Sequence, residues 1–395
     1  MRSDRRRIAV ALAGFAVFLN LYAPQSVLPL LAREFAVGAG EASLAITAST
    51  AAVALIAPFT GTFADVIGRK RVIVAAMFAL VIPTVMVALA PGLHALLFWR
   101  FMQGLVLPPI FAVTVAYIGE EWSAPDAIAM TGIYTSAASF GGFFGRLLTG
   151  VLADVAGWRI AFFSLAVVTL LLAGGVAVLL EPERRFVRSR NLLASAQQML
   201  RHFRNPPLVA TYAIGFGVLF TFIASFTYVN FYLAAPPFRL SASALGLLFV
   251  VYLGGSAITP LTGRAVARFG RKPLIIGAIA IWAGGLLLTL IPSLPAVVAG
   301  LAISATCGFL CQSVSTSFVA LSAEHGHSSA VGLYVTWYYV GGSVGGALPG
   351  LIWNRTGWPG CIGLVLVVLA LMAALVFRFW PRRPDRSCRR RKSAA

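Results

Sequence analysis

Charged residues are scarce in this chain, and acidic residues are the scarcest. Of 395 residues only 11% are charged, and Asp and Glu together number 12 against 31 Lys and Arg. Soluble domains usually carry about one quarter charged residues. A composition that is 59% hydrophobic therefore excludes an ordinary soluble domain and predicts a membrane protein.

Cysteine and histidine are also few, with four of each. Cys307 and Cys311 are four residues apart, on one helical face, so they predict no disulfide framework. His325 and His327 lack a third ligand nearby, and we expect no metal site. Neither HExxH nor a phosphate-binding GxxxxGK[ST] occurs. We therefore expect no cofactor and no enzymatic activity.

Long apolar runs recur along the chain. A helix of about 20 residues crosses a hydrocarbon core of roughly 30 Å, and a backbone exposed to lipid must satisfy its own hydrogen bonds. The sequence therefore predicts an all-α membrane protein with twelve transmembrane helices. The expected spans are residues 8–30, 43–65, 72–90, 94–118, 127–153, 158–180, 208–234, 242–267, 273–291, 295–320, 328–353 and 358–380.

The cations lie mostly on one side of these spans. With the N-terminus inside, 25 Lys and Arg fall on the inner side, four Arg on the outer side, and Arg100 and Arg146 inside spans. This bias predicts that both termini are cytoplasmic. It also explains the net charge of +19 without nucleic acid, and it predicts that the basic segments contact anionic lipid.

An internal repeat divides the spans into two sets of six. GGFFGRLLTGVLADVAGW begins at residue 141, and GGSVGGALPGLIWNRTGW begins at residue 341. Parallel halves of this kind are one repeat plan of secondary transporters, with the substrate site between them. We expect an N-terminal bundle (1–180), a cytoplasmic linker with an amphipathic helix (181–207), a C-terminal bundle (208–380) and a basic tail (381–395).

Three segments resemble a known family. GTFADVIGRKR (61–71) resembles the loop signature of the major facilitator superfamily between spans two and three. RFMQG (100–104) resembles its span-four signature, and NLYAPQSVLPLLAREF (20–35) looks like the first span of its bacterial exporters. The resemblance covers residues 8–380. It implies a monomeric transporter of the bacterial inner membrane, similar to drug exporters that exchange substrate for protons by alternating access.

In that family the loop signature acts as a gate latch. Asp65 would accept hydrogen bonds from a helix N-terminus in the other half, near Ser328 and Ser329. Arg69 would pair with Glu120 or Glu121. The alternative is a static topology anchor made by the cations alone. The residues we assign to the latch are Gly61, Asp65, Gly68, Arg69, Arg71, Glu120 and Glu121, with Gly263, Gly270 and Arg271 in a second copy that has Ala267 in place of Asp65.

Two arginines lie inside spans at a depth where no acid occurs. Intramembrane charges usually face a partner or a cavity. Arg100 and Arg146 therefore either bond to carbonyls and to polar neighbours such as Asn20, Gln25 and Gln103, or receive an anionic or carbonyl-bearing substrate. GGFFGR, around Arg146, has the glycines of the family's span-five antiporter motif and lacks its proline.

Proton coupling lacks an obvious carrier. The acids available are Asp65 and carboxylates at the outer rim, so coupling is indirect, or the protein is an uncoupled facilitator or an importer of a sugar or organic anion. A channel fits two repeated halves less well. Further polar and aromatic residues are expected either to line the substrate cavity or simply to pack between helices. They are Tyr228, Asn230, Gln312, Tyr334, Trp337 and Tyr338.

Overall fold

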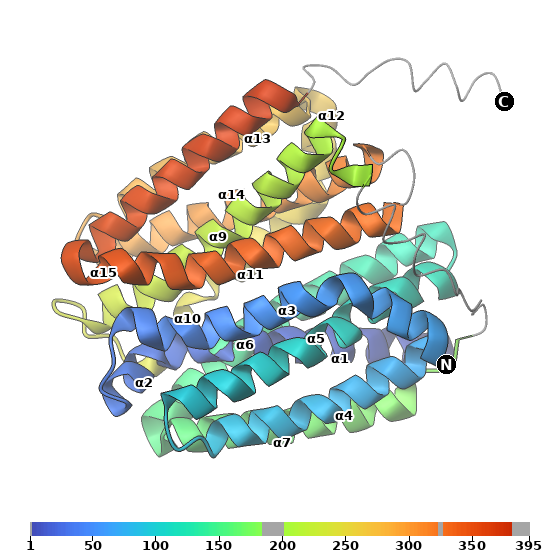
Figure 1. The fold of residues 1–395 in the computed structure, drawn as a ribbon, viewed down its shortest axis with the longest axis horizontal. Coiled ribbons are helices and arrows are strands. Elements are labelled where there is room, and N and C mark those ends of the chain that lie inside the picture. The colour runs from blue at the N-terminus through green and yellow to red at the C-terminus, as the bar shows by residue number, and fades with distance from the viewer. Residues whose placement is uncertain (1, 184–200, 323–326, 381–395) are drawn as a thin grey trace.

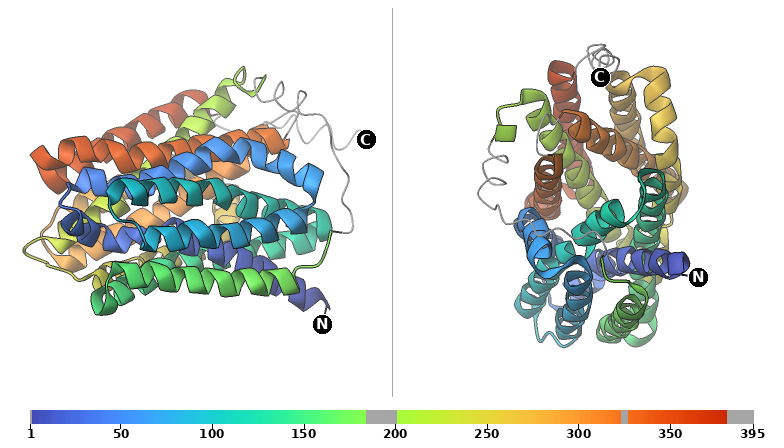
Figure 2. Two further views of the ribbon diagram at one scale, coloured as in Figure 1. Left: turned by 60° about the horizontal axis from the view of Figure 1, so that its bottom comes forward. Right: turned by 90° about the vertical axis from the view of Figure 1, so that its right-hand side faces the viewer.

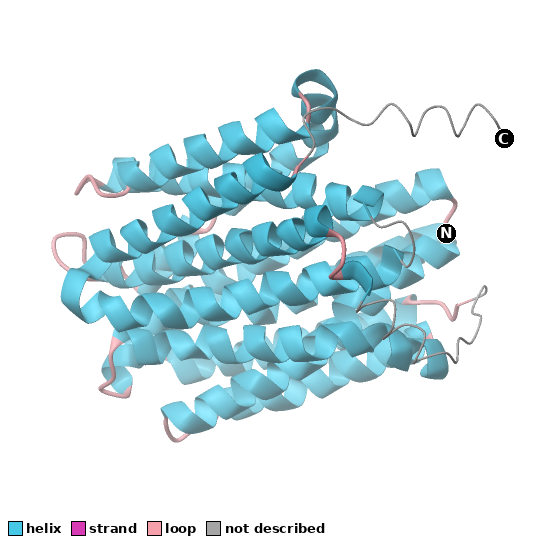
Figure 3. Ribbon diagram, turned by 45° about the horizontal axis from the view of Figure 1, so that its top comes forward, coloured by secondary structure: helices cyan, strands magenta, loops and turns pink. Residues whose placement is uncertain are grey.

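The computed structural model describes residues 2–183, 201–322 and 327–380, and every regular element in that part of the chain is helical (Figures 1 and 3). The first half contains α1 (Arg2–Leu21), η1 (Ala23–Val27), α2 (Leu28–Glu34), α3 (Ala39–Ile67), α4 (Arg69–Ala88), α5 (Leu93–Glu121), α6 (Ala124–Ala156) and α7 (Trp158–Leu179). The second half contains α9 (Pro206–Ala234), α10 (Ala242–Leu248), α11 (Val251–Ile258), η2 (Thr259–Leu261), α12 (Thr262–Phe269), α13 (Arg271–Leu288), α14 (Leu294–Ser322) and α15 (His327–Phe379).

Within these ranges, nine helices are long and apolar enough to cross a membrane, or ten if the bent run from α10 to α12 is one span. The 53-residue α15 contains two spans, because Gly357 has non-helical φ and ψ of 58° and −147°. The 33-residue α6 is less apolar and lies alongside the other long helices (Figure 1). With the bent run counted as one span, α15 as two and α6 as one, the described helices match the twelve expected spans.

Two of the expected continuous spans are broken. The first ends as an α-helix at Leu21, passes through η1 and resumes as α2. Pro24 and Pro29 fall in this stretch, and a proline interrupts helical hydrogen bonding because it has no N–H. The eighth span is likewise divided into α10, α11, η2 and α12, with Pro260 in η2.

The helices form two bundles that follow the two halves of the chain. In the first half α3 packs on α5, α1 on α6, and α4 on both α5 and α7; in the second, α9 packs on α15 and α13 on α14. Figure 2 shows the two sets on opposite sides of the molecule. The bundles meet where α3 contacts α15 and where α6 contacts α10 and α11.

The repeat is visible in atomic contacts. Two glycines of α6, and two glycines 200 residues later in α15, lie directly against the backbone of the first helix in their own half, where a Cβ would overlap it. The pairs are Gly141 with Phe15, Gly145 with Leu19, Gly341 with Phe216 and Gly345 with Phe220. Small residues permit such close helix packing in membranes. The two halves are therefore pseudo-symmetric, as the repeat predicts.

Two expected segments lie wholly or largely outside the described residues. Of the linker 181–207, residues 181–183 and 201–207 are described, so most of the predicted amphipathic helix is not. The basic tail 381–395 is also outside them. Below, the end of the molecule that carries Arg69 and Arg271 is called the basic end, and the end that carries Asp154 and Gly350 is called the Asp154 end.

Candidate functional site

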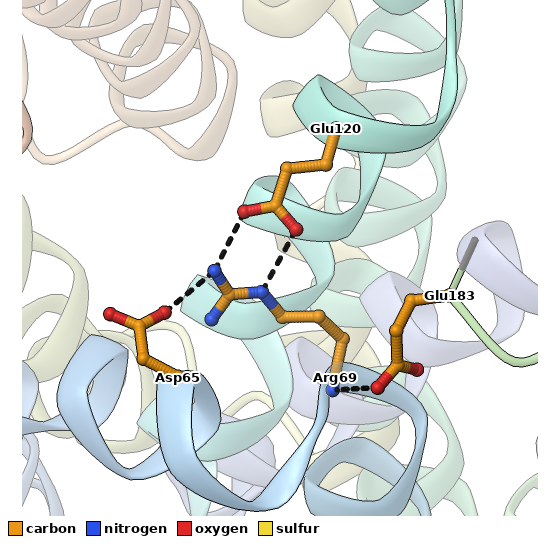
Figure 4. Close-up of polar contacts among 4 residues, drawn as sticks. All are labelled: Asp65, Arg69, Glu120 and Glu183. Carbon is orange, nitrogen blue, oxygen red and sulfur yellow. Dashed lines mark hydrogen bonds and ion pairs between the residues drawn. The ribbon is translucent and has the colours of Figure 1, made fainter. Parts of the chain in front are cut away.

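A cluster of opposite charges surrounds Arg69 at the basic end (Figure 4). The guanidinium donates through Nη2 and Nε to the two carboxylate oxygens of Glu120, at 2.6 and 3.1 Å. Its Nη2 also lies 2.7 Å from Asp65 Oδ1. Gly68, with φ of 106°, supplies the left-handed turn that separates α3 from α4. The structure thus brings Arg69 together with Glu120, one of its two expected partners.

Glu183 completes this cluster, and the sequence reasoning missed it. Its carboxylate accepts hydrogen bonds from the backbone N–H groups of Arg69 and Lys70, at 3.0 and 3.2 Å. An anion at a helix N-terminus satisfies free N–H groups and interacts favourably with the helix dipole. Glu183 follows α7 and is 114 residues from Arg69, so no local signal points to the contact.

Among the described residues, the contact shown for Asp65 lies within its own half. Asp65 pairs with Arg69, whereas Ser329 Oγ lies 3.1 Å from His202 Nε2 within the second half. The expected contact between Asp65 and the start of α15, near Ser328 and Ser329, stays a prediction, because residues 323–326 lie outside the described residues. Asp65 and Arg69 are four residues apart, on either side of Gly68, so their ion pair needs no contact between the halves.

The remaining latch residues take less central positions. Glu121 lies 3.6 Å from Arg6, and Arg71 is exposed. Gly270 has φ of 82° between α12 and α13, which repeats the turn made by Gly68. Gly61 lies within α3, and Arg271 lies at the start of α13. Gly263 lies within α12 and has open space beside it.

A carboxylate joins the halves at the Asp154 end. Asp154, beyond the expected span 127–153, accepts hydrogen bonds from the N–H groups of Ala242 and Ser243 at 3.1 and 2.8 Å, and from the Ser243 hydroxyl. It thereby caps α10 from the other half. Burial acts to raise the pKa of Asp154, but these hydrogen bonds together with one from Ser241 outweigh it and lower the pKa below its ordinary 3.8.

Close backbone contacts reinforce this junction in both repeats. A Cβ on Gly150 of α6 would overlap the carbonyl of Ala242 in α10, and a Cβ on Gly350 of α15 would lie 2.5 Å from the Cα of Gly40 in α3. Gly150 and Gly350 are 200 residues apart, so the contacts are repeat equivalents. The sequence predicted the repeated glycines but not that they seal one end.

Further towards the middle, hydroxyl groups connect α3 to α15. Thr47 donates to the carbonyl of Ser343 at 3.2 Å, and the Ser343 hydroxyl donates to Thr50 Oγ1 at 3.1 Å. The halves are therefore joined in the middle and at the Asp154 end.

The basic-end half of α6 has a different environment. Residues 131, 132, 133, 135 and 136 are all exposed. Consecutive residues turn by about 100° around a helix, so these residues span roughly 200° of its circumference. Among the described residues, α6 packs on α10 and α11 but makes no more than weak contact with α12 and α14. This part of α6 therefore stands away from the second half, whereas the halves are in contact at the Asp154 end.

Arg100 is fully buried and fully bonded within the first half. Its guanidinium donates to the backbone carbonyls of Ala45, Asn20 and Leu21 and to the side chains of Gln103 and Ser49, at 2.5 to 3.1 Å. These acceptors occupy all five N–H groups that a guanidinium carries. The geometry matches the first of the two alternatives, in which the arginine bonds to carbonyls and polar neighbours.

Arg146 is equally buried, at 1% exposure, but its surroundings are aromatic. Its Nε donates to Gln25 Oε1 at 2.7 Å and its Nη1 to the carbonyl of Gly142 at 2.6 Å. The guanidinium carbon lies 4.2 to 5.2 Å from the ring centres of Phe249, Tyr22 and Tyr252, within cation–π range. Phe249 and Tyr252 belong to the second half, so Arg146 lies at the interface between the halves.

Gln25 extends this contact across the interface. Its amide nitrogen donates to Thr227 Oγ1 at 3.0 Å, and its oxygen accepts from Arg146. Two further hydroxyls make equivalent bonds in the two repeats. Ser26 donates to the carbonyl of Arg146, and Tyr228 donates to the carbonyl of Gly346, both at 2.8 Å. Tyr228 therefore packs between helices, which is one of the two alternatives for this residue.

The other predicted cavity residues are only partly gathered. Tyr334 and Tyr338 are stacked, with ring centres 6.1 Å apart, but Trp337 is 38% exposed. Asn230 is buried and donates to the carbonyl of Phe226 at 2.6 Å, while its own oxygen has no partner among the described residues. The structure leaves Gln312 half-buried within α14.

Comparison with known proteins agrees with this architecture. The family model described as Major Facilitator Superfamily matches residues 10–236 and 219–394. The chain belongs to the Major Facilitator Superfamily. Together with the apolar helices, this membership makes the protein an integral membrane transporter rather than an enzyme.

Similar members of the Major Facilitator Superfamily occur in several bacteria. The inner membrane transport protein YnfM of Escherichia coli is 33% identical over 94% of this chain and 89% of its own length. The uncharacterized MFS-type transporter YybF of Bacillus subtilis is 30% identical over 90% of this chain and 89% of its own.

Solved structures of the superfamily share the fold. The nucleoside transporter NupG aligns with a TM-score of 0.77 at 14% identity, over 95% of this chain and all of its own. A bacterial homologue of the lysosomal transporter Spinster, described as inward-facing and unoccupied, aligns with a TM-score of 0.73 at 16% identity, over 95% of this chain and 94% of its own.

Proposed function

We propose that this transporter exports a small organic molecule by alternating access, in exchange for protons. The observation that carries the proposal is the uneven joining of the halves, which contact each other at the Asp154 end while α6 stands away at the basic end. Two pseudo-symmetric bundles can rock about a site between them. One closed gate marks one of the two states that such a cycle needs.

The basic end faces the cytoplasm in this proposal, and both termini lie there. Support comes from the 25 cations assigned to that side of the spans, because cytoplasmic loops carry the excess of Lys and Arg. The name of YnfM places that relative in an inner membrane. The structure then represents the state that is closed to the outside.

Gating would exchange one set of contacts for another. Two contacts must break when the Asp154 end opens. The carboxylate of Asp154 must release α10, and the backbone of Gly40 must separate from that of Gly350. Closing the basic end would bring α3 towards the start of α15, and Asp65 would then change partners from Arg69 to N–H groups of the other half. This gives the predicted latch residue a role in the state opposite to the observed one.

An uncoupled facilitator is the second candidate, and the placement of acids favours it. Every Asp and Glu among the described residues lies near a helix end or between helices. Proton carriers usually titrate because they are buried in a low-dielectric cavity. The most buried carboxylate for which an ion pair is seen, Glu121, is 2% exposed, but it ends α5 and lies 3.6 Å from Arg6. Coupling without a carboxylate in a cavity would require proton and substrate to compete for shared groups.

Transport in proteoliposomes that contain a pH-sensitive dye tests the proposal. Cationic drugs, organic anions and sugars are supplied under an imposed pH gradient. Release of protons that depends on substrate supports exchange. Substrate flux without proton movement selects the facilitator, and absence of flux for every class contradicts a transport function for these substrates.

A further inference from the structure

The two buried arginines differ in how completely the protein satisfies them. All five N–H groups of Arg100 have acceptors. For Arg146 the structure shows acceptors for two, namely Gln25 and the carbonyl of Gly142. The described residues supply none for the other three, and none of the ion pairs among them includes Arg146. A buried cation without an anion is costly unless something pairs with it.

The repeat argues against a purely structural role. Position 346 is the repeat equivalent of position 146. Ser26 bonds to the carbonyl of Arg146, and Tyr228 bonds to the carbonyl of Gly346, so the backbone is held in the same way at both positions. The position equivalent to Arg146 is thus a glycine, and the same helix packing exists there without a charge. The backbone of Arg146 also touches Gly246 of α10, so its place at the interface is fixed.

The rings around the guanidinium come from both halves. Tyr22 lies between α1 and η1 in the first half, while in the second half Phe249 follows α10 and Tyr252 belongs to α11. When the halves separate at the Asp154 end, Phe249 and Tyr252 move away with the second half, and Arg146 and Tyr22 remain. That movement would uncover the three free N–H groups.

A hollow of about 440 Å³ lies at the Asp154 end. Its lining includes Arg33 and Arg239 with one acid, Asp154, and also Ser26. Ser26 bonds directly to the carbonyl of Arg146. An anion that leaves or enters through this end would pass two further cations beside Asp154.

We infer that Arg146 is a substrate-binding residue for a small organic anion with a planar apolar part. The anionic group would accept hydrogen bonds from the free N–H groups, and the apolar part would pack against Tyr22, Phe249 or Tyr252. The inference names the substrate class of the proposed transporter. It rests on the alternating access of that proposal, because the site is uncovered when the Asp154 end opens, and not on the direction of transport.

Equilibrium dialysis of the purified full chain in detergent tests this without requiring transport. Radiolabelled benzoate, benzamide and benzylammonium are the probes, because they share a ring and differ in charge. The wild type should bind benzoate more tightly than benzamide by about tenfold or more, as expected for hydrogen bonds to a charged group, and should bind benzylammonium most weakly. Equal affinities, or no binding of benzoate, would overturn the assignment.

Two variants that disable the site, one that keeps its charge and one control separate a binding role of Arg146 from a role in folding. Arg146→Gln removes the charge. Gln25→Glu keeps the arginine but places a carboxylate where the amide oxygen now accepts from Nε, so the site neutralises itself. Either should abolish the preference for benzoate, and Arg146→Lys should retain part of it. Arg159→Gln, which removes an exposed cation paired with Glu34, should leave it unchanged.

Should Arg146→Gln fail to fold, Gln25→Glu and Arg146→Lys still decide the matter. Preference for benzoate that survives in Gln25→Glu would contradict the inference. The result is also distinguishable from failure of the proposed function, because benzoate binding that depends on Arg146 can be present in a protein that moves no protons.

Discussion

Asp154 on α6 holds the N-terminus of α10 in the opposite half, through the N–H group of Ser243 at 2.8 Å and that of Ala242 at 3.1 Å. The carboxylate belongs to one bundle and the helix that it caps to the other. This contact is therefore tied to the relative position of the two halves, and it breaks when they separate at the Asp154 end.

Replacing Asp154 should weaken that closure. We expect Asp154→Ala to shift the equilibrium towards the state open at this end by about 0.5–2 kcal/mol, the usual cost of losing a helix cap. The rate at which a membrane-impermeant thiol reagent labels a cysteine at position 245 should rise. Asp126→Ala is the control, because Asp126 lies on the same helix and bonds to Ser123 in its own half. Equal labelling in both variants would contradict the role given to Asp154.

The same contact predicts a dependence on pH. The pKa of Asp154 is below 3.8 in the closed state, so the carboxylate favours closure at any pH above its ordinary value. Closure should be unaffected between about pH 5 and pH 8 and should weaken as the pH falls through the lowered pKa. The labelling rate at position 245, divided at each pH by that of a cysteine in an unfolded peptide to remove the change in thiolate fraction, should stay flat from pH 8 to pH 5 and then rise towards pH 3. A transition near neutral pH would point to another group.

Gly350 should tolerate no side chain in the closed state. A methyl group there would lie 2.5 Å from the Cα of Gly40, and overpacking usually costs about 1–3 kcal/mol. Gly350→Ala should therefore favour the state open at the Asp154 end. Gly363→Ala, on the same helix with nothing within 4 Å of the added atom, should have no such effect. Faster labelling at position 245 in Gly350→Ala alone is the expected result.

Asp65 should matter for transport more than for the stability of the observed state. Arg69 keeps both bonds to Glu120 in Asp65→Asn, and partly exposed ion pairs contribute about 0–1 kcal/mol. We expect a nearly unchanged melting temperature in detergent and slower transport. Glu120→Gln should lower the melting temperature more, because the amide has no charge and a single acceptor oxygen, so it cannot accept from both Nε and Nη2 of Arg69. Melting that falls equally in the two variants would show that Asp65 supports the observed state.

Arg100 should be needed for folding. Arg100→Lys keeps the charge but cannot reach acceptors on several sides, so buried carbonyls such as those of Asn20 and Leu21 lose their partners. We expect a loss of about 3 kcal/mol or more in the free energy of unfolding, measured by unfolding in mixed micelles. The exposed Arg159→Lys should cost little. A stable Arg100→Lys protein that no longer transports would instead assign Arg100 to substrate or proton handling.

The sequence predicted two features of the fold, namely the apolar spans and the repeat of one half in the other. The twelve spans follow from run length, and the halves follow from glycines such as Gly141 and Gly341, because these features are local or periodic. Breaks in spans were missed at Pro24 and Pro260, since apolar runs continue through both. Proline alone could not have marked these breaks, because Pro58, Pro83 and Pro108 lie inside helices that continue through them.

Long-range capping contacts could not be predicted in the same way. Glu183 bonds to Arg69 across 114 residues, and Asp154 bonds to Ala242 across 88. Each carboxylate meets a helix start that only the packing of the bundles brings near it. In the sequence, Arg100 and Arg146 are two equivalent charges inside spans. Only the acceptors around them in the structure distinguish an arginine whose N–H groups are all bonded from one with free N–H groups.

Distances between spin labels at the two ends of the molecule test alternating access most directly. One pair is Val155 on α6 with Leu247 on α10, and the other is Ile128 on α6 with Phe269 on α12; all four side chains are exposed. The labels are introduced in a background with the native cysteines replaced, in lipid nanodiscs. In Gly350→Ala the first distance should lengthen while the second shortens. Distances that change in the same direction, or not at all, would contradict alternation between two closed ends.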